Sequence, residues 1–291
     1  MTCLFNDIIK LQIDNKNNYI KNIYFLNNYA CISIIIENNK IINIIEGKGF
    51  IHPTRKKQFI KFINNMLNKY DTKNIIVNIN LSDIPKKGIF NFCRVKNDNR
   101  CFLIPTFRFT ESDIQIDNKK LIFDNYDLQK EYIKDKINIK KYNKIYTNCI
   151  CHKSKVDYFK YCLQNKDICD GYCWIGSVHK LCGLNNNLAN ELCKNNFAGI
   201  DKVYWDEHLK YKYVLYNDGN TLSDRMKLLL CTNSVIIKKQ SIYEEFFTYK
   251  LKNNENYIEY NNENELRDIY NILENNNNLY KHITDNNNYF I

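Results

Sequence analysis

Two apolar runs separated by small polar residues form the part of this sequence best suited to chemistry. Residues 211–216 are aromatic and β-branched, which predicts a buried strand, and residues 235–237 predict a second one. Between them lie turn-forming residues at 217–220 and an apolar helical stretch at 226–230. A strand, a glycine turn, a helix and a further strand together predict a parallel unit whose helix N-terminus faces a phosphate.

The residues of the turn and of the first helical turn supply the chemistry of this unit. Gly219 can adopt positive φ and would bring the backbone of Asn220 and Thr221 close to a ligand. Thr221 or Ser223 can cap the helix, and Arg225 offers a planar fork that fits phosphate oxygens. The alternative is an ordinary strand–helix–strand unit with a solvated surface arginine, because glycine turns of this kind are common.

The motifs around this unit follow a specific order. They are His208, Tyr-Lys-Tyr at 211–213, Gly219, Ser-Asp-Arg at 223–225, Ser-Val-Ile-Ile at 234–237 and Glu-Phe-Phe at 245–247. Upstream lie a predicted strand at 75–79 followed by Ser-Asp-Ile-Pro at 82–85, and Ile-Pro-Thr-Phe-Arg-Phe at 104–109. In this order the motifs resemble glycosyltransferase family 90, which includes the Rumi-type protein O-glucosyltransferases and the fungal capsule xylosyltransferases.

The resemblance implies an α/β fold of the GT-B type, with two Rossmann-like domains facing a cleft. Strands and helices alternate in both halves of the sequence, which agrees with this class. We expect residues 1–140 to form the acceptor-side domain and residues 141–270 to form the nucleotide-sugar donor domain. Residues 271–291 are expected to pack back on the first domain.

The resemblance also implies an activity, an inverting O-glycosylation that uses a UDP-sugar, with glucose or xylose as the sugar and a protein or glycan as the acceptor. Asp83 would be the base that deprotonates the acceptor hydroxyl, and Arg108 and Asp113 would line the acceptor side. The implied donor-binding residues are Gly219, Asn220, Thr221, Ser223, Arg225 and Glu245. Of these, Arg225 would stabilise the departing UDP and Glu245 would bind the ribose hydroxyls. Each residue also has a plainer interpretation, a turn aspartate for Asp83 and a solvated helix carboxylate for Glu245.

One departure from the family opens a second hypothesis. The family carries Phe-Arg-Gly-Ser where this chain has Thr-Asn-Cys-Ile-Cys-His at 147–152, so the arginine, glycine and serine are absent. Lys153 or Lys155 can supply the missing charge. The alternative is a catalytically degenerate protein that binds a nucleotide sugar or a glycan without turnover.

Metal chemistry receives little support from the sequence. The chain lacks the Asp-x-Asp motif of metal-dependent transferases, so we expect a metal-independent enzyme without a cofactor. Of the 12 cysteines, seven fall between residues 149 and 193. With nearby histidines, these form a candidate zinc set: Cys149, Cys151, His152, Cys169, Cys173, His179 and Cys182. A zinc-bearing basic module that binds nucleic acid is therefore a third hypothesis, although the spacings match no standard zinc pattern.

Composition and charge bound the class of protein and its location. The net charge is +10, from 42 Lys and Arg against 32 Asp and Glu, but the lysines are scattered, which argues against a nucleic-acid partner. The abundance of Asn, Ile and Lys is typical of an AT-rich genome such as that of a large DNA virus. A secretory signal and an apolar stretch of about 18 residues are both missing, which predicts a cytoplasmic protein, in the host cytoplasm or a virus factory, with no membrane span.

Overall fold

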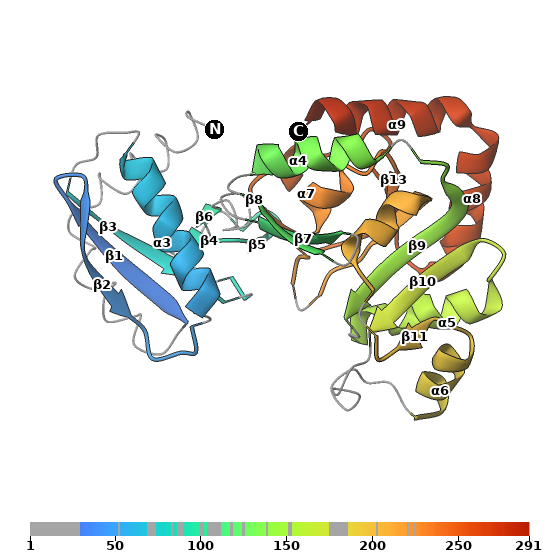
Figure 1. Cartoon of the computed structure of the whole chain (residues 1–291), viewed down its shortest axis with the longest axis horizontal. Coiled ribbons are helices and arrows are strands. Elements are labelled where there is room, and N and C mark those ends of the chain that lie inside the picture. Colours follow the sequence, from blue (N-terminus) through green and yellow to red (C-terminus); the bar gives the residue numbers. More distant parts are fainter. Residues whose placement is uncertain are drawn as a thin grey trace. The chain divides into compact units, whose positions relative to one another are not determined.

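The computed structural model forms two compact units, Met1–Thr110 and Glu111–Ile291, and each is described by itself (Figure 1). The described residues are 30–51, 53–68, 74–82, 84–85, 90–98, 102–103, 112–116, 119–123, 126–137, 139–150, 153–174, 186–201, 203–219, 221–223 and 225–290. In this part of the chain, no helix has the length and the apolar character that crossing a membrane requires.

The first unit contains a sheet with strand order β2-β1-β3-β4-β6. Its elements are β1 (Cys31–Glu37), β2 (Lys40–Glu46), α3 (Pro53–Leu67), β3 (Ile75–Asn80), β4 (Phe90–Asn91), β5 (Arg94–Val95) and β6 (Phe102–Leu103). The hairpin between β1 and β2 is closed by Asn38 and Asn39, which both have positive φ, 48° and 59°. This is the backbone that a two-residue hairpin turn requires, and Asn tolerates it. The strands β1, β2 and β3 pair antiparallel, so the sheet of this unit is mixed and not wholly parallel.

Helix α3 covers one face of this sheet. Its apolar side chains Phe59, Ile63 and Leu67 are buried and pack in one cluster with Ile32 and Ile34 of β1. The predicted strand at 75–79 is confirmed as β3, which is one residue longer.

The second unit is built on a parallel sheet of six strands. Its elements are β7 (Ser112–Ile116), β8 (Lys119–Phe123), α4 (Tyr126–Lys136), β9 (Tyr142–Ile150), η4 (Lys153–Lys155), α5 (Val156–Gln164), β10 (Cys169–Trp174), α6 (Asn186–Lys194), β11 (Ala198–Gly199), η6 (Trp205–Lys210), β12 (Tyr211–Tyr216), α7 (Met226–Leu229), β13 (Val235–Lys239), β14 (Tyr243–Glu244), η7 (Thr248–Lys250), β15 (Ile258–Tyr260), η8 (Glu263–Glu265), α8 (Leu266–Asn275) and α9 (Asn277–Phe290). The strand order is β11-β10-β9-β12-β13-β15, and every neighbouring pair runs parallel.

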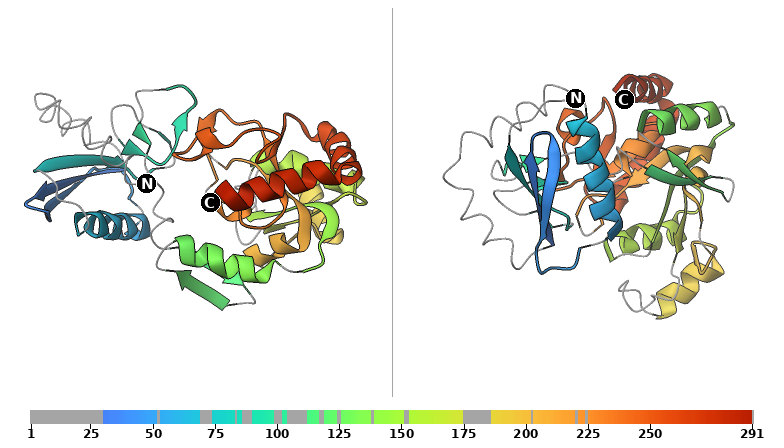
Figure 2. Two further views of the ribbon diagram at one scale, coloured as in Figure 1. Left: turned by 90° about the horizontal axis from the view of Figure 1, so that it is seen from above. Right: turned by 60° about the vertical axis from the view of Figure 1, so that its left-hand side comes forward.

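Helices cover both faces of this sheet (Figures 1 and 2). Along β12, Tyr213 and Leu215 join the core that includes residues of α5, α6 and α8, whereas Val214 and Tyr216 join the core that includes α7. Successive side chains of a strand point to opposite faces, so both faces of β12 are buried, as its unbroken apolar run predicts. The α/β class is confirmed, and this unit has the strand order of a Rossmann fold.

The C-terminal helices belong to the core of the second unit. Ile269 and Leu273 of α8 and Ile283 of α9 lie in the same apolar cluster. Helix α9 is also held by a reciprocal amide pair, in which Asn256 Nδ2 donates to Asn287 Oδ1 at 3.2 Å and Asn287 Nδ2 donates to the Asn256 carbonyl at 2.9 Å. Asn287 is therefore a structural residue, although it lies in an Asn-rich run. The predicted return of residues 271–291 to the first domain stays a prediction.

The compact unit begins upstream of the domain boundary that the sequence analysis placed near residue 140. The parallel sheet itself begins at Tyr142. The hairpin β7–β8 and helix α4 precede the sheet and are part of the same unit. The arrangement of two domains around a cleft likewise stays a prediction.

We expect Gly171→Ala to destabilise the second unit. Gly171 pairs with Thr147 on the neighbouring strand, and a Cβ at this position would lie 2.7 Å from the Thr147 carbonyl oxygen. The contact involves backbone, so the strands must shift, and the free energy of unfolding should fall by about 1–3 kcal/mol. Urea unfolding followed by circular dichroism measures this change. Gly219→Ala is the matched control, because its Cβ would meet nothing within 4 Å. Equal losses in both variants would contradict the packing argument.

Candidate functional site

The site lies where the strand order of the second unit reverses direction. From β9 the chain crosses by α5 to β10 on one side, and from β12 it crosses by α7 to β13 on the other side. The carboxyl ends of β9 and β12 are neighbours, and their connections diverge. In open α/β sheets such a point is the usual place for a ligand. The predicted phosphate-binding turn follows β12 directly and therefore lies at this point.

Arg225 is anchored across this point by contacts to β9. Its Nη1 donates to the Asn148 carbonyl at 2.7 Å and lies 3.4 Å from Thr147 Oγ1. Its Nε donates to Ser223 Oγ at 3.1 Å. Within the described residues, the buried Nη2 has no hydrogen-bond partner. An orphaned guanidinium nitrogen held in a fixed direction is suited to an anionic ligand, because a buried unpaired donor is costly without one.

Tyr216 holds the loop that carries Arg225. Its buried hydroxyl accepts a hydrogen bond from the Ser223 amide at 3.1 Å and donates to the Ser223 carbonyl at 2.7 Å. Burial, together with the charges of Glu245 and Asp218, raises the pKa of Tyr216 well above its usual value, so the phenol keeps its proton. From the sequence, Tyr216 is predicted only as the last residue of a strand. Its role depends on a contact with a residue beyond the turn, which a strand pattern does not indicate.

The structure corrects two details of the predicted phosphate turn. The φ angle of Gly219 lies outside the left-handed region, so no special backbone conformation requires glycine here. Neither Thr221 nor Ser223 caps the helix, because α7 is a single turn that begins after Arg225 without a side-chain cap. So short a helix has a weak dipole, and the positive charge of the site comes from side chains.

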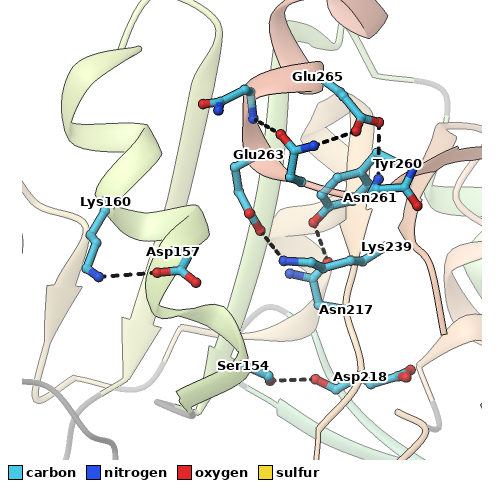
Figure 3. A network of polar contacts seen from close by, with 12 residues as sticks. Ser154, Asp157, Lys160, Asn217, Asp218, Lys239, Tyr260, Asn261, Glu263 and Glu265 are labelled. Carbon is cyan, nitrogen blue, oxygen red and sulfur yellow. Dashed lines mark hydrogen bonds and ion pairs between the residues drawn. The ribbon is translucent and has the colours of Figure 1, made fainter. Parts of the chain in front are cut away.

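Lys155 is the second cation at this point. It lies at the end of η4, and its buried Nζ donates to the Asn217 carbonyl at 2.8 Å. The neighbouring Ser154 hydroxyl donates to the Asp218 carbonyl at 2.7 Å, so η4 is tied to the loop after β12 (Figure 3). Burial first, and then the charge of Arg225, lowers the pKa of Lys155 to about 7. Of the two lysines that the sequence offered as substitutes for the missing charge, Lys155 lies beside this loop, and the side chain of Lys153 is not described.

Hydrogen bonds also order the segment on the far side of this loop (Figure 3). Tyr260 donates to Asn217 Oδ1 at 2.7 Å, and the Ser241 hydroxyl donates to Asp218 Oδ2 at 2.5 Å. Lys239 forms an ion pair with Glu263 at 2.7 Å. These contacts join the segments at the carboxyl ends of β12, β13 and β15, so the start of the loop after β12 is fixed by its neighbours.

Glu245 is buried and lies close enough to Tyr216 to raise the pKa of that phenol. Its backbone is fixed by Thr248, whose hydroxyl accepts from the Glu245 amide at 2.9 Å. Glu245 and Arg225 both act on the pKa of Tyr216, and the donor-binding role of Glu245 stays a prediction.

His208 is fixed as a neutral residue beside Arg225. Its Nδ1 lies 2.8 Å from the Trp205 carbonyl, and its Nε2 accepts from the Asn148 amide at 3.5 Å. Burial, followed by the charge of Arg225, lowers the pKa of His208 to about 3. The imidazole therefore supports the end of β9 and does not act as an acid or base near neutral pH.

The remaining predicted site residues lie outside what the structure describes in full. Asp83, Arg108 and Asn220 are outside the described residues. The backbone of Asp113 lies in β7, in the second unit, and its side chain is not described. Thr221 is buried beside Gly219, whose amide donates to the Thr221 carbonyl at 2.9 Å.

The cysteine-rich segment lies partly in the sheet. Cys149 and Cys173 are register partners on β9 and β10, and neither forms a disulfide. Four members of the candidate zinc set, Cys151, His152, His179 and Cys182, lie outside the described residues. In the part of the chain that is described, no group of three or more His, Cys, Asp or Glu residues is arranged to hold a metal ion.

Comparisons with known proteins identify the family. The chain matches the family model of glycosyl transferase family 90 over residues 27–291, and it belongs to that family. The resemblance inferred from the motifs is thereby confirmed, and the protein is of the glycosyltransferase class. A comparison with curated proteins found no match.

Two solved structures are similar over part of the chain. One is the C-terminal domain of a glycosyl transferase group 1 family protein, LpcC, from Francisella tularensis, with 9% identity, a TM-score of 0.38, and coverage of 55% of this chain and 90% of that one. The other is Anabaena Alr3699/HepE in complex with UDP-glucose, with 9% identity, a TM-score of 0.39, and coverage of 55% of this chain and 46% of that one. At these scores the likeness supports no further argument.

The lowered pKa of His208 predicts acid sensitivity. Below pH 6.5 the unfolded chain binds a proton at this histidine, whereas the folded chain does not until about pH 3. Stability should therefore fall by about 1.4 kcal/mol per pH unit across this window through this residue. Urea unfolding between pH 7 and 5 measures the slope. His208→Gln should unfold with a shallower pH dependence than the native chain, while His282→Gln, on the exposed side of α9, should not. Identical slopes for His208→Gln and the native chain would refute this assignment.

Proposed function

We propose that this protein is an inverting glycosyltransferase that moves a sugar, glucose or xylose, from a UDP-sugar to a hydroxyl of a protein or glycan acceptor. Membership of family 90 supports sugar transfer. The observation that carries the donor assignment is the orphaned, buried Nη2 of Arg225 at the strand-order reversal. A diphosphate is the ligand chemistry that this guanidinium fits best.

Arg225 would act on the leaving group. As the bond between the anomeric carbon and the diphosphate breaks, negative charge grows on the β-phosphate. The guanidinium is held by Asn148 and Ser223 before the donor arrives, so it loses little freedom when it binds that charge. Such an interaction strengthens as the bond breaks and therefore accelerates the reaction as well as binding the donor.

The acceptor chemistry rests on the family resemblance. Asp83 would take the proton from the acceptor hydroxyl, whose oxygen attacks the anomeric carbon on the side opposite the departing UDP. An α-linked donor would then give a β-linked product. Arg108 and Asp113 would line the acceptor side, and Glu245 would accept hydrogen bonds from the ribose of the donor.

The reaction is proposed to need neither a metal nor another cofactor, because a fixed cation can supply the charge that a metal ion supplies elsewhere. The cytoplasmic location and the viral source remain predictions from composition, and no nucleic-acid partner is proposed.

The second candidate is a degenerate member of the family that binds a nucleotide sugar or glycan without turnover. It is favoured by Thr147 and Asn148, which stand in the segment where the family has an arginine and a glycine and which contact Arg225 through Thr147 Oγ1 and the Asn148 carbonyl. This candidate predicts UDP binding without product.

We expect the purified protein to release UDP from one donor of a panel comprising UDP-glucose, UDP-xylose, UDP-galactose, UDP-N-acetylglucosamine and GDP-mannose, in the presence of EDTA. Arg225→Ala should lower kcat/KM by roughly 10²–10³-fold, as the loss of one donor to a developing oxyanion does. Arg225→Lys should recover only part of this loss, because an ammonium lacks the fork. Release of the nucleotide is followed by a coupled assay.

Arg267→Ala is the matched control, because this arginine pairs with Asp167 on the surface at 2.6 Å, away from the site. Asp83→Asn tests the proposed base and should abolish turnover while donor binding persists. UDP binding without release from any donor, in the presence of candidate glycan and peptide acceptors, would favour the degenerate protein. Unchanged turnover in Arg225→Ala would exclude its leaving-group role.

A further inference from the structure

Lys155 is a buried lysine whose ammonium has more N–H donors than its described surroundings accept. Its ammonium has three N–H donors, and within the described residues its hydrogen bond is to the Asn217 carbonyl. The side chain belongs to a residue that is 5% exposed, so water does not replace the missing partners freely. A buried ammonium with unfilled donors is costly unless a ligand completes them.

The charges around Lys155 are of both signs. Arg225 is close enough to lower its pKa, and His208, whose own pKa Lys155 helps to lower, is neutral. The groups that favour its charged form are Cys149 on β9, Asp218 after β12 and Cys173 on β10. Of these, Asp218 is already engaged through Oδ2 by the Ser241 hydroxyl. Arg225 and Lys155 are neighbouring cations with unfilled N–H donors, and an anion that carries two charges would complete the donors of both.

We propose that Lys155 is the second cation of the donor site, and that it binds the diphosphate of the nucleotide sugar in its protonated form, so that donor binding takes up a proton from solvent. The inference rests on the proposed function. The proton comes from water or buffer and joins the neutral amine, and the resulting ammonium forms an ion pair with the diphosphate. Arg225 would bind the same diphosphate through its orphaned Nη2.

The pH dependence of donor binding follows from the direction in which the pKa of Lys155 is shifted. The free site holds Lys155 with a pKa of about 7, so at pH 8 the amine is mostly neutral. A bound dianion favours the charged form and raises this pKa. Binding at pH 8 should therefore take up close to one proton, and affinity should fall by about tenfold per pH unit above pH 7. At pH 6 the amine is already protonated, so uptake should be near zero.

Isothermal titration calorimetry with UDP-glucose tests this proposal, in Tris and in HEPES at pH 8 and in two buffers at pH 6. The two buffers at each pH have different ionisation enthalpies. The difference between the binding enthalpies measured in them therefore gives the number of protons that the complex takes up. UDP-glucose is the suitable probe, because its diphosphate is esterified on both sides and lacks the group that titrates near pH 6 in a terminal phosphate. Uptake of close to one proton at pH 8 and none at pH 6 is the expected result.

Variants of Lys155 and Cys149 identify which side chain takes up the proton. Lys155→Met should bind UDP-glucose more weakly at pH 6, without uptake at pH 8, and Lys155→Arg should bind without uptake and with little pH dependence. Lys160→Met, an exposed lysine of α5 that pairs with Asp157, should behave as the native chain (Figure 3). Cys149→Ser is needed because contact with Cys173 and the nearby cations lower the pKa of Cys149 to about 7, so this thiol could take up the proton instead.

The outcomes separate the two proposals. Uptake that persists in Cys149→Ser and disappears in Lys155→Arg would support Lys155 as the acceptor. Binding of UDP-glucose without uptake at pH 8, or uptake that survives in both Lys155 variants, would overturn the inference and leave the proposed function intact. Absence of UDP-glucose binding at pH 6 in the folded native chain would overturn the UDP-glucose donor assignment and the inference together.

Discussion

The pairing of β9 with β12 places two crossovers of opposite direction side by side, and the site depends on this arrangement. The end of each strand supplies a backbone carbonyl that fixes one of the two cations of the site. The end of β9 supplies the carbonyl of Asn148 that fixes Arg225, and the loop after β12 supplies the carbonyl of Asn217 that fixes Lys155. The two cations are thus each attached to the strand from which they do not come. A shift of one strand along the other would separate both cations from their anchors.

Sequence patterns predicted the elements whose burial is continuous. Strand β12 has the predicted limits because both of its faces are covered, so nearly every position is apolar or aromatic. The strands β10 and β11 and the helix α9 were not predicted. Helix α9 is rich in asparagine, which hides its amphipathic pattern, and its docking uses the amide of Asn287 as well as apolar contacts. In the first unit the two-residue turn at Asn38 and Asn39 reverses the chain, so β1 and β2 pair antiparallel and the sheet is mixed.

The candidate site was predictable where it is local in sequence. Ser223 and Arg225 lie in one short segment, and their bond is found in the structure. The contacts that give the site its electrostatics join residues about 60 to 80 positions apart, such as Arg225 with Asn148 and Lys155 with Asn217. No spacing rule describes such contacts. The predicted helix caps at Thr221 and Ser223 are wrong because α7 begins only after Arg225, beyond the reach of both side chains.

The Asn256–Asn287 amide pair has a consequence for how this gene can change. Asparagine and lysine codons differ only at the third base, so in a chain this rich in asparagine a single transversion readily exchanges the two. On the surface the exchange adds one more lysine and is harmless. At Asn287, which is 2% exposed, it would place an ammonium in the space of an amide that both donates and accepts. Selection should therefore preserve this asparagine among neighbours that drift freely.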